Sequence, residues 1–258
     1  MIVLWVVSDL LRLDTLKKHQ KCKLIRKEDV RQYQLLFWSC RQVANQRFDY
    51  LVDWDPEALK NSLLAGKPLI HAALDRDDEN METFAMLLKA GMKYLPEHLG
   101  LLFRKNSLGT TACEFAFEQQ GKDETFKVIQ ERIPADSDYP VLHHVITHTP
   151  HYMDDFTLRY PSAIFLRDEN QHCLLHAALS SGTHLNTDAV FILRMRDYEI
   201  EEIDPVTELY PFAIAASAAE IDLFTIFHLL RRNPRRSSSK KRTSGKAGTL
   251  ENESVTKL

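Results

Sequence analysis

The sequence predicts an all-α fold: a helical-repeat solenoid of helix-turn-helix units, followed by a disordered C-terminal tail. Three observations favour this class. The 258 residues include only eight glycines, fewer than all-β folds and glycine-rich nucleotide-binding folds usually need. Apolar residues recur at helical spacing in long stretches of the chain. One four-residue pattern occurs five times: a bulky apolar residue comes first, His often second, any residue third and usually Ala fourth. The second positions of successive copies are 29 to 43 residues apart.

Residues 1–65 are interpreted as a helical N-terminal cap or as degenerate repeats, because the end units of a stacked array need a polar outer face. We expect a helix over 2–13, a solvated basic connection over 17–27 and a second helix from Asp29 to Cys40. The apolar run 1–7 lacks a basic flank and is too short to cross a bilayer. We therefore expect no signal peptide and no membrane segment.

Residues 66–234 are predicted to form five repeats, each with a turn, a short first helix and a second helix. The first repeat is the clearest. Gly66 opens its turn, residues 69–74 make its first helix, and a second helix runs over 82–90. Gly91 follows that helix, where a left-handed C-terminal cap is expected.

The other four repeats are less regular. Gly109 lies at the turn of the second repeat, and Pro150 and Pro161 break the third into short pieces. The second helix of the fourth repeat is expected around 188–193, and that of the fifth over 222–232. Pro234 ends the folded region, and residues 235–258 form the tail.

Two columns of the pattern have a packing explanation. A small residue lets the first helix approach its neighbour closely, while the bulky residue before the His fills the gap between helices. The small column consists of Ala73, Ala116, Ala178 and Ala215. The histidine column consists of His71, His143 and His176.

Over about 66–234 these patterns resemble the ankyrin-repeat family, whose motif is Thr-Pro-Leu-His-x-Ala. The chain departs from the motif in several ways. Asp138, Gln171 and Glu208 stand where the family has its turn glycine, and the Thr-Pro pair is never intact. The resemblance implies a concave surface of turns and first helices that contacts other proteins, with the repeat His hydrogen-bonded to backbone. Another helical-pair solenoid is the alternative fold.

The predicted function is therefore a non-catalytic protein-protein interaction scaffold. Its partners would be other proteins, bound through the repeat surface, with Tyr139, His172 and Tyr210 near the turns as candidate contacts. We expect no cofactor and no small-molecule substrate, because no nucleophile-elbow, dinucleotide-binding or Walker-type motif is present.

A cluster of histidines supports one alternative, a metal-dependent enzyme. His144 and His148 share a helix face, and His151 adds a third nitrogen that could ligate a metal ion. Against this, His143 belongs to the repeat column, the helix should already end near His148, and no H-E-x-x-H motif occurs.

The distribution of charge and the cysteine content predict which partners the chain binds and where in the cell it is found. Net charge is −3, but eight Lys and Arg and no Asp or Glu lie between Arg231 and Gly248, so a basic tail follows an acidic body. Tail-mediated nucleic-acid binding is a further alternative that the net charge does not favour. The basic tail also fits a nuclear import signal, and Ser238 fits a site for a kinase that recognises basic residues.

The four cysteines form no motif and are expected to be free thiols. We therefore expect the protein in the cytoplasm, with nuclear entry through the tail.

Overall fold

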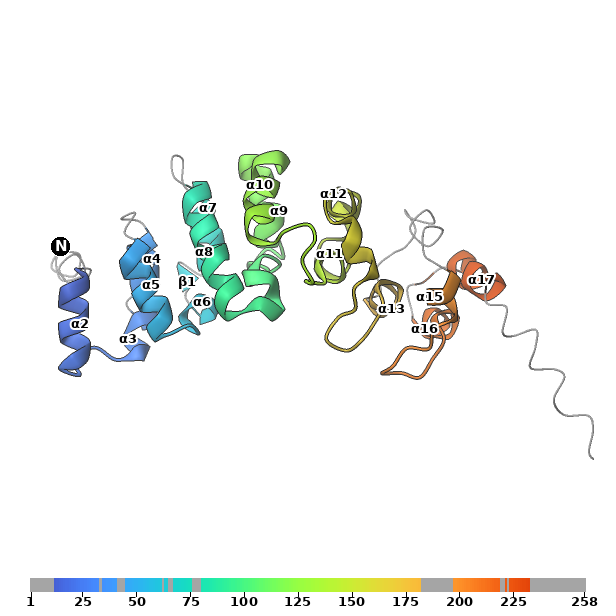
Figure 1. Ribbon diagram of the computed structural model, residues 1–258, viewed down its shortest axis with the longest axis horizontal. Coiled ribbons are helices and arrows are strands. Elements are labelled where there is room, and N and C mark those ends of the chain that lie inside the picture. The colour runs from blue at the N-terminus through green and yellow to red at the C-terminus, as the bar shows by residue number, and fades with distance from the viewer. Residues whose placement is uncertain are drawn as a thin grey trace, which may run out of the picture. The chain divides into compact units, whose positions relative to one another are not determined.

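The computed structural model describes residues 12–32, 34–40, 45–61, 63–64, 67–75, 80–181, 197–218, 221 and 223–232. These residues are mostly helical and contain one short antiparallel strand pair, which confirms the all-α class (Figure 1). The chain divides into two compact units, an N-terminal unit, Met1–Asp168, and a C-terminal unit, Glu169–Leu258. The boundary falls at the turn of the fourth predicted repeat.

The N-terminal unit is built from helix pairs. Its elements are α2 (Leu13–Lys21), α3 (Lys27–Gln32), α4 (Leu35–Cys40), α5 (Asn45–Trp54), α6 (Ala58–Asn61), β1 (Leu63–Leu64), β2 (Lys67–Pro68), α7 (Leu69–Leu74), α8 (Asn80–Tyr94), η1 (Pro96–Leu101), α9 (Ala112–Gln120), α10 (Lys122–Arg132), α11 (Val141–His148), η2 (Pro150–Tyr152), α12 (Met153–Arg159) and η3 (Pro161–Phe165). Within this unit α4 packs on α5, α7 on α8, α9 on α10 and α11 on α12.

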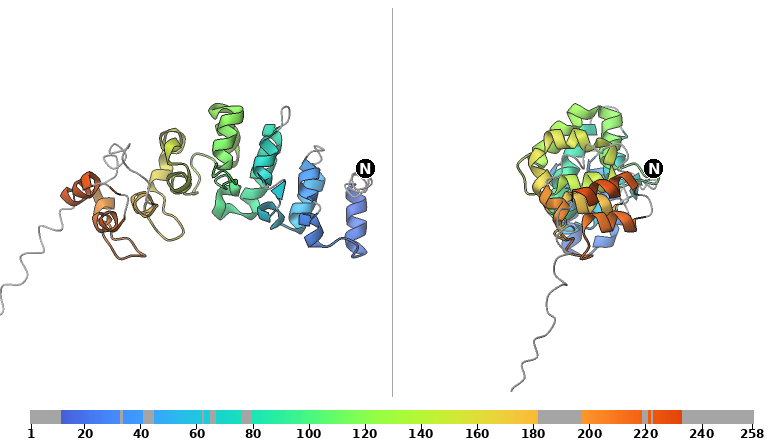
Figure 2. Two further views of the ribbon diagram at one scale, coloured as in Figure 1. Left: turned by 180° about the vertical axis from the view of Figure 1, so that it is seen from behind. Right: turned by 90° about the vertical axis from the view of Figure 1, so that its right-hand side faces the viewer.

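Neighbouring pairs of the N-terminal unit stack in two layers. The first helices α4, α7 and α9 contact one another in order, and the second helices α5, α8 and α10 do the same (Figures 1 and 2). Side chains between the layers are buried, among them Phe48, Phe84 and Phe126. Because a single helix pair cannot cover its own apolar face, each pair depends on its neighbours for burial.

The connection before α9 shows how local sequence sets an element boundary. The Thr111 hydroxyl accepts a hydrogen bond from the Glu114 backbone N–H, and the Glu114 carboxylate accepts one from the Thr111 N–H. This reciprocal capping box fixes the start of the helix. Gly121 then takes a φ of +83°, which lets α10 begin immediately after α9.

The N-terminal region differs from the sequence prediction in two places. The basic stretch 17–27, expected to be a connection, is helical over 17–21, which form the end of α2, and at Lys27, where α3 begins; Leu16 of α2 is buried. The helix predicted from Asp29 to Cys40 is two helices, because Gln34 takes a φ of +53° and interrupts it. The turn places Leu35 and Leu36 in the core.

Gly91 is not the predicted left-handed cap. Helix α8 continues past it to Tyr94. A Cβ atom on Gly91 would lie 2.4 Å from the carbonyl oxygen of Gly100 in η1, so the glycine is needed for close approach rather than for a positive φ. Gly100 itself takes a φ of +62°.

The C-terminal unit contains α13 (Leu174–Ser180), α15 (Asp197–Glu201), α16 (Pro211–Ser217) and α17 (Leu223–Arg231). Helix α13 packs on α16, and α16 on α17. Gly66, the helix expected around 188–193 and the tail 235–258 with Ser238 lie outside the described residues. In the described part of the chain, no helix is long and apolar enough to cross a membrane.

Candidate functional site

Three of the turns that precede the first helices share a backbone feature, whereas Asp138, at the corresponding position of the third predicted repeat, does not have it. Gly109, Gln171 and Glu208, which align at one position of the predicted repeat, all take positive φ, of +84°, +65° and +56°. Gln and Glu adopt this conformation only where the surrounding structure enforces it. In the second repeat the Asn106 side chain accepts hydrogen bonds from the N–H groups of Leu108 and Thr110, at 2.9 and 3.1 Å.

An aspartate has the same role in the fifth repeat. Asp204 is buried and accepts a hydrogen bond from the Thr207 N–H at 2.8 Å and one from the Thr207 hydroxyl. His172 Nε2 lies 3.0 Å from its other oxygen. Burial raises the pKa of the Asp204 carboxyl, but the two Thr207 hydrogen bonds and the nearby His172 and His176 together lower it below its ordinary value. Local bonds of this kind, from a side chain to nearby backbone, fix the loop without regular secondary structure.

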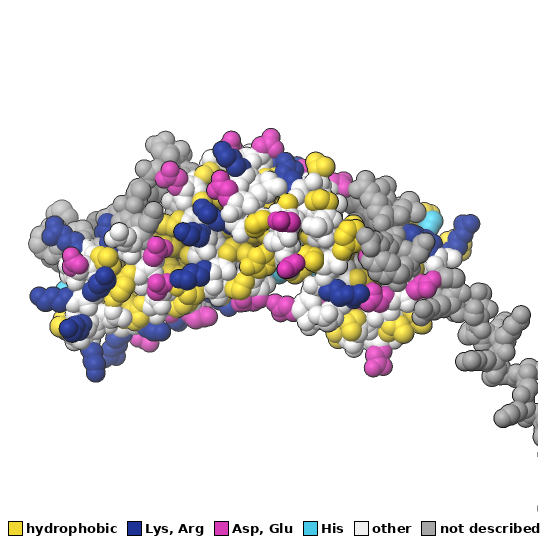
Figure 3. Space-filling model, viewed as in Figure 1, with side chains coloured by type: hydrophobic (Ala, Val, Ile, Leu, Met, Phe, Trp, Pro, Cys, Tyr) yellow, Lys and Arg dark blue, Asp and Glu magenta, His cyan; other side chains and the backbone are white. Residues whose placement is uncertain are grey.

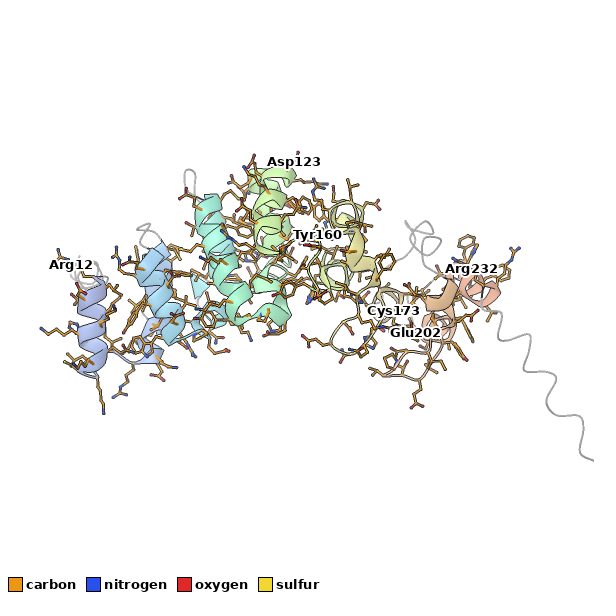
Figure 4. The ribbon with its side chains drawn as sticks, viewed as in Figure 1. Arg12, Asp123, Tyr160, Cys173, Glu202 and Arg232 are labelled. Carbon is orange, nitrogen blue, oxygen red and sulfur yellow. The ribbon has the colours of Figure 1, made fainter. Side chains whose placement is uncertain are left out.

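Two histidines of the predicted column contact backbone carbonyls in the segment that leads into the next predicted repeat. His71 Nε2 lies 3.0 Å from the Thr110 carbonyl oxygen, and His176 Nε2 lies 3.2 Å from that of Glu202, which is labelled in Figure 4. Both rings are buried, and burial lowers both pKa values. A neutral imidazole donating to a carbonyl fits these sites.

The small column is buried throughout. Ala116, Ala178 and Ala215 have no exposed surface, and Ala73 is 6% exposed. Val145 takes this place in the third repeat and is also fully buried. The tyrosine that follows this repeat's second helix, Tyr160, donates its hydroxyl to the Ile133 carbonyl oxygen at 3.0 Å (Figure 4).

The histidine cluster does not form a single group. His144 and His148 lie on one face of α11 with ring centroids 6.3 Å apart, whereas His151 in η2 is 3.2 Å from the Glu114 carboxylate and packs on Tyr152. His143 is buried in the repeat column. Nowhere in the described ranges do three or more His, Cys, Asp or Glu side chains lie close enough together to hold a metal ion.

His144 and His148 instead form a pocket with residues some 40 positions earlier in the chain. Phe103 stacks on both rings, with centroid distances of 5.9 and 6.1 Å. The pocket has a volume of about 410 Å³, and its lining also includes Lys60, His98 and Arg104. We call it the histidine pocket. It lies where α6 leads into β1 and where η1 leads into the turn of the second repeat.

Burial sets the protonation of this pocket. It lowers the pKa of His144 to about 4, with smaller contributions from the neighbouring histidines His148, His143 and His98, while Asp168 opposes the shift. Burial and then Lys105 lower the pKa of His148, and burial lowers that of Arg104. At neutral pH His144 is therefore uncharged.

Acidification is expected to destabilise the N-terminal unit. Between pH 6.5, the ordinary pKa of histidine, and about 4, the unfolded chain binds a proton at His144 that the folded chain does not. The free energy of unfolding therefore falls as the pH falls through this range, by up to about 3 kcal/mol for this group. Urea unfolding at pH 7.5 and 5 should show it. His144→Gln should reduce the pH dependence, and an unchanged dependence would contradict this account.

A second concave feature lies along the second helices. A groove of about 1140 Å³ runs over α5, α8 and α10 and is lined by acidic residues such as Asp53 and Glu131, basic ones such as Lys93 and Lys127, and apolar ones such as Met86. Lys93 Nζ lies 2.9 Å from the Asp53 carboxylate, so part of this charge is paired internally. Figure 3 shows hydrophobic, basic and acidic side chains interleaved on one face of the chain.

The three residues predicted to contact a partner are only partly exposed to solvent. Tyr139 and Tyr210 are half-buried, and Tyr210 stacks on Phe212 with centroids 5.9 Å apart. The His172 side chain is 14% exposed because it pairs with Asp204. Their role in partner binding stays a prediction. Sequence reasoning missed Lys60, Phe103 and Arg104, which carry no motif of their own.

Comparison of the chain with protein-family models, with curated proteins and with solved structures finds no significant match in any of the three.

Proposed function

We propose that the chain is a non-catalytic protein-interaction scaffold built from ankyrin-like repeats. One observation carries the proposal: the turns before α9, α13 and α16 each have a positive φ at the aligned position, although the turn before α11 does not. Each of these first helices also buries a small residue of the predicted column. Arrays of such repeats present extended surfaces to other macromolecules.

The histidine bonds support the same proposal. His71 and His176 each reach the turn that follows their own repeat, so they link successive repeats rather than prepare a reaction. The two layers of helices in the N-terminal unit agree with a stacked array. Another solenoid of helical pairs would share the layers but would not need these turn-directed histidines.

The turns offer the surface that a partner would meet. Leu108 at the tip of the second turn is 87% exposed, and Val206 in the fifth is 62% exposed. Ile203 and Leu209 flank Val206 and are also exposed. Loops held by a rigid scaffold commonly carry binding residues.

The thiols fit a scaffold better than an enzyme. Cys173 Sγ lies 3.4 Å from His176 Nδ1, and the Asp204 carboxylate lies 4.0 Å from the same nitrogen. In a catalytic triad the nucleophile and the carboxylate contact opposite nitrogens of the imidazole, so these three residues do not have that arrangement. All three residues are buried, and burial raises the Cys173 pKa to about 11. A nucleophilic cysteine needs a lowered pKa and access to substrate.

The proposed location is a reducing compartment, the cytoplasm, with nuclear entry through the basic tail. All four cysteines are free thiols, and Cys40, Cys113 and Cys173 are buried. Free cysteines are usual where glutathione and thioredoxin keep thiols reduced.

Affinity capture with mass spectrometry tests the proposal. The intact chain is compared with the turn variant Leu108→Ser/Val206→Ser and with Leu158→Ser, a control whose leucine is 79% exposed on α12. Proteins captured by the intact chain are then purified, and their dissociation constants are measured. We expect the turn variant to weaken binding at least about tenfold and the control to leave it unchanged. Equal binding by all three would overturn the proposed turn surface, and partners that bind the isolated tail would favour the basic segment instead.

A further inference from the structure

Arg104 is a half-buried cation for which the residues that the structure describes provide no acidic partner. Its Nη1 donates to the Lys60 carbonyl oxygen, and in the described part of the chain no carboxylate lies within ion-pair distance of its guanidinium. Arg31 shows the contrast: it donates from Nε and Nη2 to the Asp55 carboxylate at 2.7 and 2.8 Å. A charge held away from water is unfavourable unless a counter-charge meets it.

The surroundings of Arg104 concentrate positive and protonatable groups. Lys60, His98, His144 and His148 line the histidine pocket with it, and the lining that the structure describes includes no Asp or Glu. Two acidic residues lie nearby. The Glu97 carboxylate is 3.8 Å from His98 Nε2, and Asp168 is close enough to affect the pKa of His144. Neither of them lines the pocket.

We propose that the histidine pocket binds an anionic side-chain group, a phosphoryl or carboxylate group, presented by the polypeptide partner of the scaffold. The inference rests on the proposed function and names the chemistry of its partner. The guanidinium fork of Arg104 is suited to two oxygens of one anion, and the imidazoles of His144 and His148 supply N–H donors beside it.

Shape and position agree with a side chain as the occupant. A volume of about 410 Å³ falls in the range of small-ligand sites and is too small for a folded element. In the lining, Asn61 lies two residues before β1, and Arg104 directly precedes the turn of the second predicted repeat. An acidic side chain from a segment lying on the turns could therefore enter this pocket.

The first experiment uses inorganic phosphate and the full chain at pH 6.5. Titration is followed by NMR of the histidine Cε1–H signals, assigned with His144→Gln and His148→Gln. We expect saturable shifts of both signals in the intact chain and in the control Lys127→Gln, an exposed cation on α10. Arg104→Gln should weaken the affinity at least about tenfold.

A second experiment distinguishes the sources of the anion. Fluorescent ten-residue peptides of one sequence carry a central phosphoserine, phosphotyrosine, glutamate or glutamine, and binding is measured by anisotropy. We expect at least one acidic peptide to bind at least about tenfold more tightly than the glutamine peptide, and Arg104→Gln to abolish the difference. Arg104→Lys keeps the charge without the fork and should retain an intermediate preference.

Three results would overturn the inference: no saturable shift of the His144 and His148 signals, equal affinity of Arg104→Gln and the intact chain, or phosphate binding without any preference for acidic peptides. Circular dichroism melts of each variant show whether it is folded. If Arg104→Gln unfolds, the same comparisons are made with His148→Gln. Captured partners that are lost with the turn variant but retained by Arg104→Gln would leave the scaffold proposal standing while this inference fails.

Discussion

Replacing Gly91 by alanine is expected to destabilise the N-terminal unit by about 3 kcal/mol. The new Cβ would lie 2.4 Å from the Gly100 carbonyl oxygen and 2.6 Å from its Cα, both backbone atoms that a rotamer change cannot move. Helix α8 and η1 would have to separate, although Leu88 and Leu99 are buried on either side of the contact.

The sign of the effect makes this test decisive. In a helix that nothing approaches, glycine to alanine stabilises by about 1 kcal/mol, because alanine loses less backbone entropy. Urea unfolding followed by circular dichroism compares Gly91→Ala with Lys89→Ala, a change of an exposed residue on the same helix. Lys89→Ala should stay within about 0.5 kcal/mol of the intact chain. A stabilised Gly91→Ala would show that η1 does not pack on α8 in this way.

Gly91 also shows where sequence reasoning reaches its limit. A glycine after an apolar helical run fits a left-handed cap, and nothing local distinguishes that role from a close approach to a later segment. The partner, Gly100, is reached only because η1 turns back on α8, with positive φ at Leu99 and Leu101. Leucine does not favour that conformation, so the turn depends on tertiary packing.

The first helices were more predictable. The sequence predicts a helix over 69–74, and α7 has those bounds. Pro68 ends the preceding segment, and the six residues after it are apolar or favour a helix. The buried alanines were also recognisable, because their spacing repeats. Of the three residues that replace the turn glycine, Gln171 and Glu208 have positive φ, whereas Asp138 in the third predicted repeat does not.

The histidine pocket was recognisable only in part. The i,i+4 spacing of His144 and His148 places them on one helix face, and the structure has them there. Their neighbours Phe103 and Arg104 come from a segment whose path depends on η1. The metal alternative required a third histidine, His151, beside them, but α11 ends at His148 and Pro150 begins η2, and His151 lies beside Glu114.

Replacing Ala178 by glutamate is expected to unfold α13 and its neighbour α16. Ala178 has no exposed surface, and Leu174, Leu175 and Leu179 of the same helix are also buried. A carboxylate there would be desolvated among apolar side chains, and the larger side chain would force the helices apart. The combined cost should exceed about 4 kcal/mol. Ser180→Glu, at an exposed position of the same helix, is the control and should be nearly neutral.

Amide hydrogen exchange locates the damage. In an array of repeats each repeat contacts only its neighbours, so a local break spreads as far as the interfaces are coupled. We expect Ala178→Glu to remove protection from α13 and α16 and to leave α7, α8 and α10 protected. Loss of protection in all of these helices would show one cooperative domain, in which burial in the C-terminal unit supports the whole fold. If α7, α8 and α10 stay protected, Ala178→Glu is a specific probe of the C-terminal unit. Partners that no longer bind this variant must then need α13, α16 or their turns. Ligands of the histidine pocket should still bind it.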